Sequence, residues 1–443
     1  MAAETLAVWM DGFATPAGQL SRSEQGNTSF AYSGDYLDRG GLPLSLSLPL
    51  ADGAFDDVAT RAFFANLLPE NAQLQRILEC EGLQRDDIVG LLHQLGADCA
   101  GAVSCLPLGA PPAKVPGVLA ADYEPLGDAA AIRIVRSLAE ARRLPAEVDA
   151  PSPVAGVQSK IALTVLPDGR FALPRAGLHV PTTHILKVPE RRRGKDARLE
   201  ESAALLAAAV GLDVSIPQAV KVGDYEALLI ERFDRRVADG VVSRIHQEDF
   251  AQALGFSSEL KYQRHGVEGR RFDIDAALSV LDRTRDPQAA RLAFVRATLF
   301  NLCIGNTDNH AKNHALLYDA GSAPRLAPLY DMMPIRLDRD FTHQLAFDLG
   351  EAEYFDAMTA ADLRSFLVQC GVDDMAGFVE QVAVPMIEAL EAATPGLRSL
   401  GQRRFDDLVG RETDRLVDLP GAAIEPCARD ASILEGGGRA QGS

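Results

Sequence analysis

Hydrophobic and polar positions follow different periods along the chain. Residues 1–105 combine short apolar runs at 6–10, 28–33 and 43–50 with helical periodicity at 59–82 and 86–96. Alternation with a period of two indicates strands, whereas apolar positions three and four apart indicate helices. We therefore predict a small mixed α/β module that ends near residue 110.

The stretch from Leu106 to Asp128 is rich in proline and glycine, a composition typical of a linker or surface excursion. We predict that residues 111–150 connect two folded parts. Alternation returns between 153 and 232, in apolar runs separated by Pro, Asp and Gly, and indicates a twisted antiparallel sheet over 151–233. One alanine- and leucine-rich helix, 200–212, interrupts this sheet.

Beyond about residue 235 the pattern is mainly helical, at 247–255, 273–284, 289–305 and 358–418, apart from one hairpin over 314–331. We predict a helical lobe over 234–418 and a flexible tail over 419–443. The periodicities together predict an α+β protein with a small N-terminal module, and the length of 443 residues predicts at least two lobes.

Composition and charge exclude several classes of protein. Hydrophobic residues make up 47% of the 443 residues and charged residues 24%, which is typical of a folded globular chain. The formal net charge of −18 disfavours nonspecific nucleic-acid binding by the whole surface. The first residues lack the pattern of a signal peptide, and no apolar run approaches the roughly 20 residues that cross a bilayer. We expect a cytoplasmic protein without a membrane partner.

Cysteines and basic residues give weaker signals. Six cysteines are scattered without a C-x-x-C pair, so we expect buried small apolar residues, not zinc ligands or disulfides. The dense basic run ERRRGKDAR, 190–198, is most simply a solvated loop. The alternative is a docking site for an acidic partner, or for RNA held by that partner.

The segment 300–331 carries the most informative polar residues. Asp308 and Asn313 stand five apart in a polar loop after an apolar helix, and Asp331 ends the hairpin that follows. Phosphoryl transfer needs a carboxylate to orient the attacking hydroxyl, with an amide oxygen and a second carboxylate to hold Mg²⁺ against the phosphates. The D-x-x-x-x-N spacing matches the protein-kinase catalytic loop, although His310 replaces the usual lysine and Asp331 lies outside a D-F-G motif. The alternative is a set of ordinary turn and cap residues.

Lys187 lies inside the apolar run THILKVP, where a lysine requires a charged partner or must reach solvent at the sheet edge. In a kinase it would bind the ATP phosphates and pair with a glutamate of the next helix, here Glu200 or Glu201. Upstream, Gly156 and its neighbours could lie over phosphates, with Lys160 adding a cation.

The run EALLIERFDRR leaves the predicted sheet where the helical region begins, so its backbone is a candidate hinge for adenine. Glu231 and Phe233 would supply main-chain contacts, while Asp234 would reach the ribose or bridge the lobes. The alternative is an ordinary crossing between domains with a surface Asp and Arg pair.

At this point the sequence resembles the HipA family of toxin kinases. The resemblance runs through residues 5–335, and its motifs are WMDG, PLSLSLPL, FFANLLPEN, GAVSCLP, VAGVQSK, PTTHILKVP, ERFDRR, HQEDFAQALG, IGNTDNHAKN and LAPLYD. It implies a bilobal protein-kinase-like fold with an N-terminal HipA-type module and an all-helical C-terminal lobe.

The resemblance also implies roles for individual residues. Asp308 corresponds to the catalytic aspartate, Asn313 and Asp331 to metal ligands, and Glu200 to the partner of the lysine. The implied ATP contacts are Ala155, Gly156, Val157, Gln158, Ser159, Lys160, Lys187, Glu231, Arg232, Phe233, His310, Lys312 and Asn313.

Family members phosphorylate aminoacyl-tRNA synthetases, alone or with tRNA bound, and so arrest translation and growth in a state linked to persistence. HipB-like helix-turn-helix antitoxin dimers restrain them and carry them onto operator DNA. The resemblance implies the same partners here, with ATP and Mg²⁺ as cofactors. One departure concerns the phosphate loop: Pro153 stands where relatives often carry an autophosphorylated serine, so Ser152 and Ser159 are the remaining candidates.

Two other functions fit the residues. A small-molecule kinase uses a similar arrangement of lobes, although the N-terminal module and the basic run favour a macromolecular substrate. A nucleotide-gated co-repressor without catalysis would also bind ATP, but the full set of Asp308, Asn313, Asp331 and Lys187 disfavours it.

Overall fold

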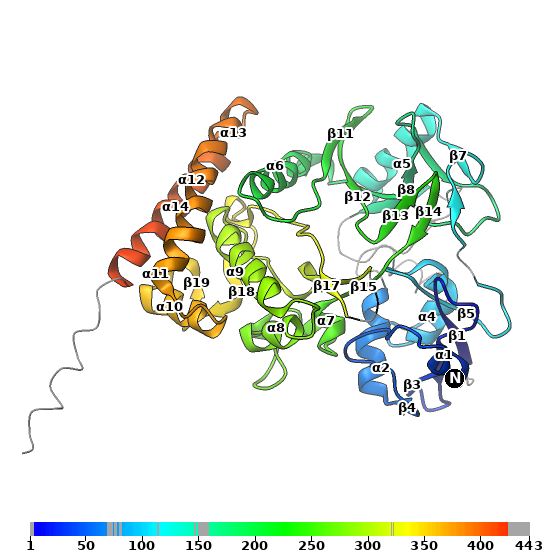
Figure 1. Cartoon of the computed structure of the whole chain (residues 1–443). Coiled ribbons are helices and arrows are strands. Elements are labelled where there is room, and N and C mark those ends of the chain that lie inside the picture. The colour runs from blue at the N-terminus through cyan, green and yellow to red at the C-terminus, as the bar shows by residue number, and fades with distance from the viewer. Residues whose placement is uncertain are drawn as a thin grey trace, which may run out of the picture.

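An N-terminal module, a sheet-containing lobe and a large, mainly helical lobe pack together in the computed structural model (Figure 1). The structure describes residues 4–68, 74, 78, 82–112, 115–145, 148, 159–319, 321 and 323–423. Ser152 and Ala155 through Gln158 of the predicted phosphate loop lie outside these residues. No described helix combines the length and apolar character that crossing a bilayer requires.

The N-terminal module is built on an antiparallel sheet in the order β4-β3-β2-β1-β5. Its core gathers Leu6, Leu20, Phe30 and Phe64 from strands and helix, as the alternating pattern predicts. The bounds are β1 (Glu4–Met10), β2 (Gly18–Arg22), β3 (Thr28–Tyr32), α1 (Gly34–Asp38), β4 (Ala54–Phe55), α2 (Asp57–Phe64), α4 (Ile88–Leu95) and β5 (Val103–Pro107).

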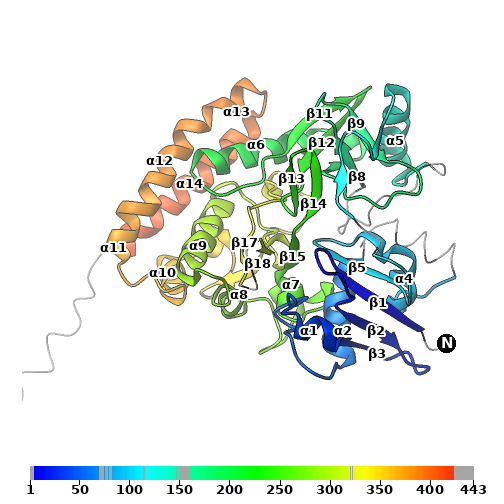
Figure 2. The same ribbon diagram turned by 45° about the vertical axis from the view of Figure 1, so that its right-hand side comes forward.

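The apolar run 43–50 does not form a strand, contrary to the prediction. The Ser45 hydroxyl donates to the buried carboxylate of Glu248, and that of Ser47 donates to the carbonyl of Gln252 at 2.6 Å. The alternate polar positions of this run therefore bind the large lobe instead of facing solvent. In Figures 1 and 2 the module accordingly lies beside β15 (His246–Asp249) and α7 (Phe250–Ala253).

The sheet-containing lobe has the strand order β11-β12-β10-β8-β9-β7. The prediction of an antiparallel sheet over 151–233 is correct for its described part, since each of these pairs is antiparallel. The bounds are β7 (Tyr123–Pro125), α5 (Asp128–Ala141), β8 (Lys160–Val165), β9 (Phe171–Pro174), β10 (His184–Lys187), α6 (Lys195–Ala209), β11 (Gln218–Val222) and β12 (Tyr225–Glu231).

Residues 111–150 are more than the predicted connecting segment. β7 pairs with β9 at the edge of the sheet, and α5 packs Ile134, Val135 and Leu138 into the core of this lobe. The Pro- and Gly-rich composition of residues 106–128 led to the prediction of a linker, although the amphipathic helix α5 follows directly.

The helical lobe begins with strands, which corrects the predicted onset of helix near 235. β13 (Arg235–Ala238) and β14 (Val241–Arg244) form a hairpin that also pairs with β6 (Gly117–Val118), and β15 pairs with β16 (Ala315–Tyr318). The expected helix 247–255 is reduced to α7, because Asp249 ends the strand and caps the helix with a capping box.

The all-helical description of the large lobe therefore needs correction. The predicted hairpin is present as β16 with β17 (Arg325–Leu326), and β18 (Gln344–Leu349) pairs with β19 (Ala352–Tyr354) in an unexpected second hairpin. The helices are α8 (Ile274–Leu281), α9 (Pro287–Cys303), α10 (Ala360–Gln369), α11 (Met375–Phe378), α12 (Val384–Ala393), α13 (Pro395–Ser399) and α14 (Arg403–Ala423), so helix continues into the predicted tail.

Helix α6 belongs to the core of the large lobe, although the chain enters it from the sheet. Ala203, Ala207 and Val210 share one buried cluster with Phe294, Phe300 and other large-lobe residues. Figure 1 shows α6 between β11 and the helices of the large lobe. The four described cysteines, at 99, 105, 303 and 370, are buried and free, as predicted for them.

Candidate active site

Three charged side chains from different elements meet between the lobes. Lys187, at the end of β10, places its Nζ 2.7 Å from Oε2 of Glu200 on α6 and 2.5 Å from Oδ1 of Asp331. The side chains of Lys187 and Glu200 are buried, whereas Asp331 is 46% exposed. The other candidate partner, Glu201, instead accepts from the backbone N–H of Ala219 at 2.9 Å. The structure thus brings Lys187 together with Glu200.

The electrostatics of this cluster keep its cation charged. Burial alone would lower the pKa of Lys187, but Asp331 and Glu200 together raise it above its usual value. Lys187 in turn lowers the pKa of Asp331 to about 2. Burial raises the pKa of Glu200, against the attraction of Lys187. A cation held by two carboxylates, one of them accessible, suits the binding of phosphate groups.

The loop after α9 carries Asp308 and is fixed by amide side chains. Nδ2 of Asn306 donates to Oδ1 of Asn301 at 2.9 Å, and the N–H of Asp308 donates to Oδ1 of Asn306 at 3.1 Å. Nδ2 of Asn313 then donates to the carbonyl of Asp308 at 2.7 Å. This bond spans the D-x-x-x-x-N motif and joins its first and last residues.

A tyrosine that no sequence pattern distinguishes contacts the catalytic candidate. The hydroxyl of Tyr262 donates to Oδ1 of Asp308 at 2.6 Å. Burial raises the pKa of Asp308, while this hydrogen bond opposes the increase. Tyr262 lies in the irregular stretch between α7 and α8, where no periodicity or spacing marks a functional residue.

His310 lies in the same loop as a neutral imidazole. Burial lowers its pKa to about 3, and its Nδ1 is buried without a hydrogen-bond partner among the described residues. Lys160 lies opposite Lys187 in the β8–β10 ladder, so both side chains face the same side of the sheet. Lys160 also lowers the pKa values of Asp331 and Glu200, which places its charge near the cluster.

The candidate hinge follows β12 directly. Glu231 ends the strand opposite His184, the N–H of Arg232 donates to the carbonyl of Thr183, and the ring of Phe233 packs against Tyr330 next to Asp331. Ser159, the first described residue after the phosphate loop, accepts from the N–H of Val188 at 2.8 Å. Phe233 thus lies against the residue before Asp331, and Ser159 is bonded to the residue after Lys187.

Two predicted nucleotide contacts have other partners. Asp234 is buried between Arg232 and Arg235 and accepts from the N–H of Gly101, so it bridges the lobes and the N-terminal module and is not directed at a ribose. Lys312 donates to Asn66 of the module and to Asp249, so its ammonium is directed at these groups and not at a nucleotide. Both side chains were assigned to ATP because position in a motif does not show where a side chain points.

The residues fit a metal held jointly by protein and phosphate. Asp331 is ionised, adopts a positive φ of 57° and has a half-exposed side chain, while Asn313 carries an amide oxygen. No group of three or more His, Cys, Asp or Glu side chains within the described residues could hold a metal alone. A hard cation such as Mg²⁺ would therefore be completed by phosphate and water oxygens, as is usual for this ion.

The basic run 190–198 is largely neutralised. Arg193 donates to Asp196 at 2.7 Å and to Asp338 at 2.6 Å, and Arg198 donates to Glu226 at 2.8 Å. These ion pairs favour the solvated-loop interpretation over a docking site for an acidic partner.

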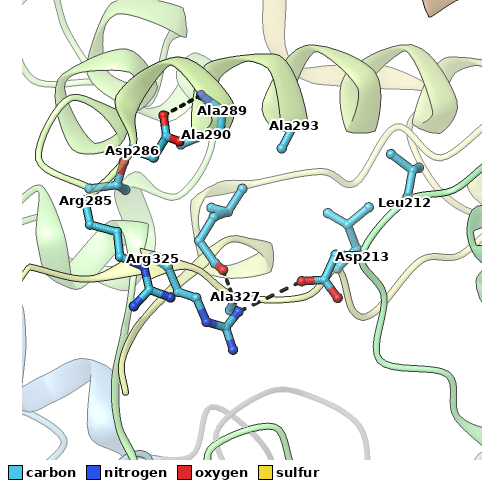
Figure 3. Close-up of a pocket in the computed structure, with 12 residues that line it drawn as sticks. Leu212, Asp213, Arg285, Asp286, Ala289, Ala290, Ala293, Arg325 and Ala327 are labelled. Carbon is cyan, nitrogen blue, oxygen red and sulfur yellow. Dashed lines mark hydrogen bonds and ion pairs between the residues drawn. The ribbon is translucent and has the colours of Figure 1, made fainter. Parts of the chain in front are cut away.

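A cavity of about 240 Å³ lies elsewhere, between the first turn of α9, β17 and the segment after α6. Figure 3 shows Ala289 and Ala293 of α9 opposite Leu212, with the Arg325–Asp213 ion pair at one side. None of the described residues predicted for catalysis or nucleotide binding lines it.

The fold and the site define a two-lobed kinase. The family model described as the HipA-like C-terminal domain matches residues 152–394, and that of the HipA N-terminal domain matches residues 6–106. The chain therefore belongs to the HipA family, as a HipA-like serine/threonine kinase.

Individual relatives agree with this assignment. A putative kinase of Sinorhizobium fredii, Y4mE, is 37% identical over 84% of this chain and 87% of its own length. The serine/threonine-protein kinase toxin HipA of Shewanella oneidensis is 30% identical over 84% of each chain. A solved structure of Shewanella oneidensis HipA with HipB and operator DNA superposes with a TM-score of 0.78, at 26% identity, over 94% of this chain and 97% of that chain.

Proposed function

We propose that this kinase transfers the γ-phosphoryl group of ATP to a serine or threonine of a protein, with Asp308 as the catalytic base. The observation that carries the proposal is the cluster of Lys187, Glu200 and Asp331, which adjoins the Asp308–Asn313 loop through the bond from the Tyr330 hydroxyl to the carbonyl of Lys312. The bound nucleotide and Mg²⁺ supply the phosphoryl group and neutralise the charge that develops on it.

In this scheme each residue has a separate task. Lys187 would hold the α- and β-phosphates, and Asn313 and Asp331 would hold the metal. Asp308 accepts the proton of the acceptor hydroxyl as the oxygen of that hydroxyl bonds to the γ-phosphorus. At the same time the bond between the γ-phosphorus and the bridging oxygen breaks, and ADP leaves. Ala155 through Lys160 would cover the phosphates, and the main chain of Glu231, Arg232 and Phe233 would border the adenine.

We further propose that the enzyme is the toxin of a toxin–antitoxin pair in the cytoplasm, where it phosphorylates an aminoacyl-tRNA synthetase and stops translation. Kinship with a HipA toxin supports this proposal. The solved HipA relative is bound to HipB and operator DNA, which supports a HipB-like dimer as antitoxin and a co-repressor role. The net charge of −18 agrees with contact to DNA through the antitoxin.

The test compares wild-type enzyme with Asp308→Asn in a cell lysate supplied with γ-labelled ATP and Mg²⁺. General-base assistance is worth about 10²- to 10⁴-fold, so we expect the variant to lose labelling of acceptor proteins while it still binds ATP. Asp224→Asn, which changes an exposed aspartate in the β11–β12 turn, is the matched control. Full activity of Asp308→Asn contradicts the catalytic assignment, and consumption of ATP without labelled protein indicates a small-molecule kinase. Phosphoproteomics of the labelled bands names the acceptor.

A further inference from the structure

Residues 261–264, around Tyr262, form a segment that binds the catalytic loop on one side and β18 on the other. The carbonyl of Lys261 accepts from the N–H of Ala311 within that loop at 3.1 Å. On the other side, Gln263 exchanges two hydrogen bonds with Asp348 of β18, and Arg264 donates to the carbonyl of Leu345. The backbone position of Tyr262 is therefore fixed independently of its hydroxyl.

The ring of Tyr262 is also held by contacts that do not involve the hydroxyl. The guanidinium of Arg264 lies 4.0 Å from the ring centroid, and the His310 ring meets it edge-on at 5.0 Å. Such contacts orient an aromatic ring through its π-system. A phenylalanine at this position would make the same ring contacts, so packing does not account for the hydroxyl of Tyr262.

The hydroxyl meets the carboxylate at the length of a charge-assisted hydrogen bond. Bonds of this kind to an ionised oxygen are short, at about 2.5–2.7 Å, and stronger than bonds between neutral groups. The bond from Tyr262 to Oδ1 of Asp308 is 2.6 Å long. It fixes the rotation of the carboxylate and occupies one of its two oxygens.

We propose that Tyr262 is the positioning residue of the catalytic base: it holds Oδ1 of Asp308, so that Oδ2 takes the proton of the acceptor hydroxyl. This inference rests on the proposed role of Asp308. Tyr262 remains bonded to Oδ1 throughout the transfer and loses no proton. The acceptor proton moves to Oδ2 as the new oxygen–phosphorus bond forms and ADP departs.

The test is Tyr262→Phe, which keeps the ring and its packing and removes only the hydroxyl. With the acceptor protein purified from the labelled lysate, we expect kcat to fall about 10- to 100-fold, because one hydrogen bond to a charged group is lost. The KM for ATP should stay close to wild type. Tyr225→Phe is the matched control, because its hydroxyl also donates to a carboxylate, that of Glu140, on the surface of the sheet.

A double-mutant cycle separates positioning from a structural role. If Tyr262 acts through Asp308, then Tyr262→Phe has no further effect on kcat when Asp308→Asn is already present. Independent, multiplying losses, or an unchanged or increased kcat in Tyr262→Phe alone, would overturn the inference. Full activity of Asp308→Asn would instead overturn the proposed function, so the two failures are distinguishable.

Discussion

Lys312 gives a quantitative test of how the N-terminal module supports the catalytic loop. Its ammonium donates to Oδ1 of Asn66 at 2.8 Å and to Oδ2 of Asp249 at 2.9 Å, and the side chains of this ion pair are only 9% and 15% exposed. Nδ2 of the buried Asn66 donates to the carbonyl of Phe256 at 2.9 Å. One contact therefore joins the module, the catalytic loop and α7.

Replacing Lys312 by Met removes the charge and keeps most of the aliphatic stem. Removing one partner of a buried ion pair costs about 3–5 kcal/mol. We expect the lower end, about 3 kcal/mol, because Asp249 keeps some exposure and its Oδ1 still caps α7. Asn66→Ala removes a hydrogen bond to a charged group, which is worth about 1.5–3 kcal/mol.

The assay is urea unfolding of wild type, both single variants and the double variant, with kcat measured for each. Both substitutions remove the same contact, so the double variant should lose about 1–2 kcal/mol less than the sum of the single losses. We expect kcat to fall in parallel, because the loosened loop carries Asp308 and Asn313. Arg170→Met, which breaks an exposed ion pair with Asp168, should have no measurable effect. Losses that add within about 0.5 kcal/mol would refute the coupling.

Two further predictions concern buried charges. Lys187→Met leaves Glu200 and Asp331 without their shared cation. Phosphotransfer should therefore fall by about 10²-fold or more, and the melting temperature should decrease. An active, equally stable variant would show that the cluster is dispensable. Burial raises the pKa of Glu248 from 4.5 to about 7, so the folded protein keeps a proton that the unfolded chain loses between these values. The contribution of Glu248 to stability is then greatest below pH 4.5 and decreases by up to about 3 kcal/mol as pH rises through 7. Urea unfolding across this range measures the slope, and Glu248→Gln should remove this part of it; equal slopes in both proteins would rule out this source.

The elements whose sequence pattern is local were predictable. Alternation located β8, β10 and β12, and the run of apolar residues before Gly305 located α9. The charged residues of the candidate site were also predictable from local sequence. A lysine in an apolar strand is unusual without a function, and so is a D-x-x-x-x-N loop before a hairpin. The structure places Lys187, Glu200 and Asp331 in contact, and Asn313 against Asp308.

The remaining features depend on contacts between distant parts of the chain. Ser45 and Ser47 look like the polar positions of a strand, but they bind Glu248 and Gln252 of another lobe. Asp234 and Lys312 lie within motifs that suggest a nucleotide, yet their side chains are directed at the N-terminal module. Tyr262 has no distinguishing neighbours in sequence, and only its bond to Asp308 identifies it.

The position of α6 limits how such an enzyme can be switched off. The buried alanine face of this helix is part of the large lobe's interior, while Glu200 reaches from it to Lys187. An outward displacement of α6 that separated Glu200 from Lys187 would leave a cavity in that interior and expose apolar surface to water. Inhibition by such a displacement is thus costly, and a regulator gains more by acting on β8 and β10, which carry Lys160 and Lys187.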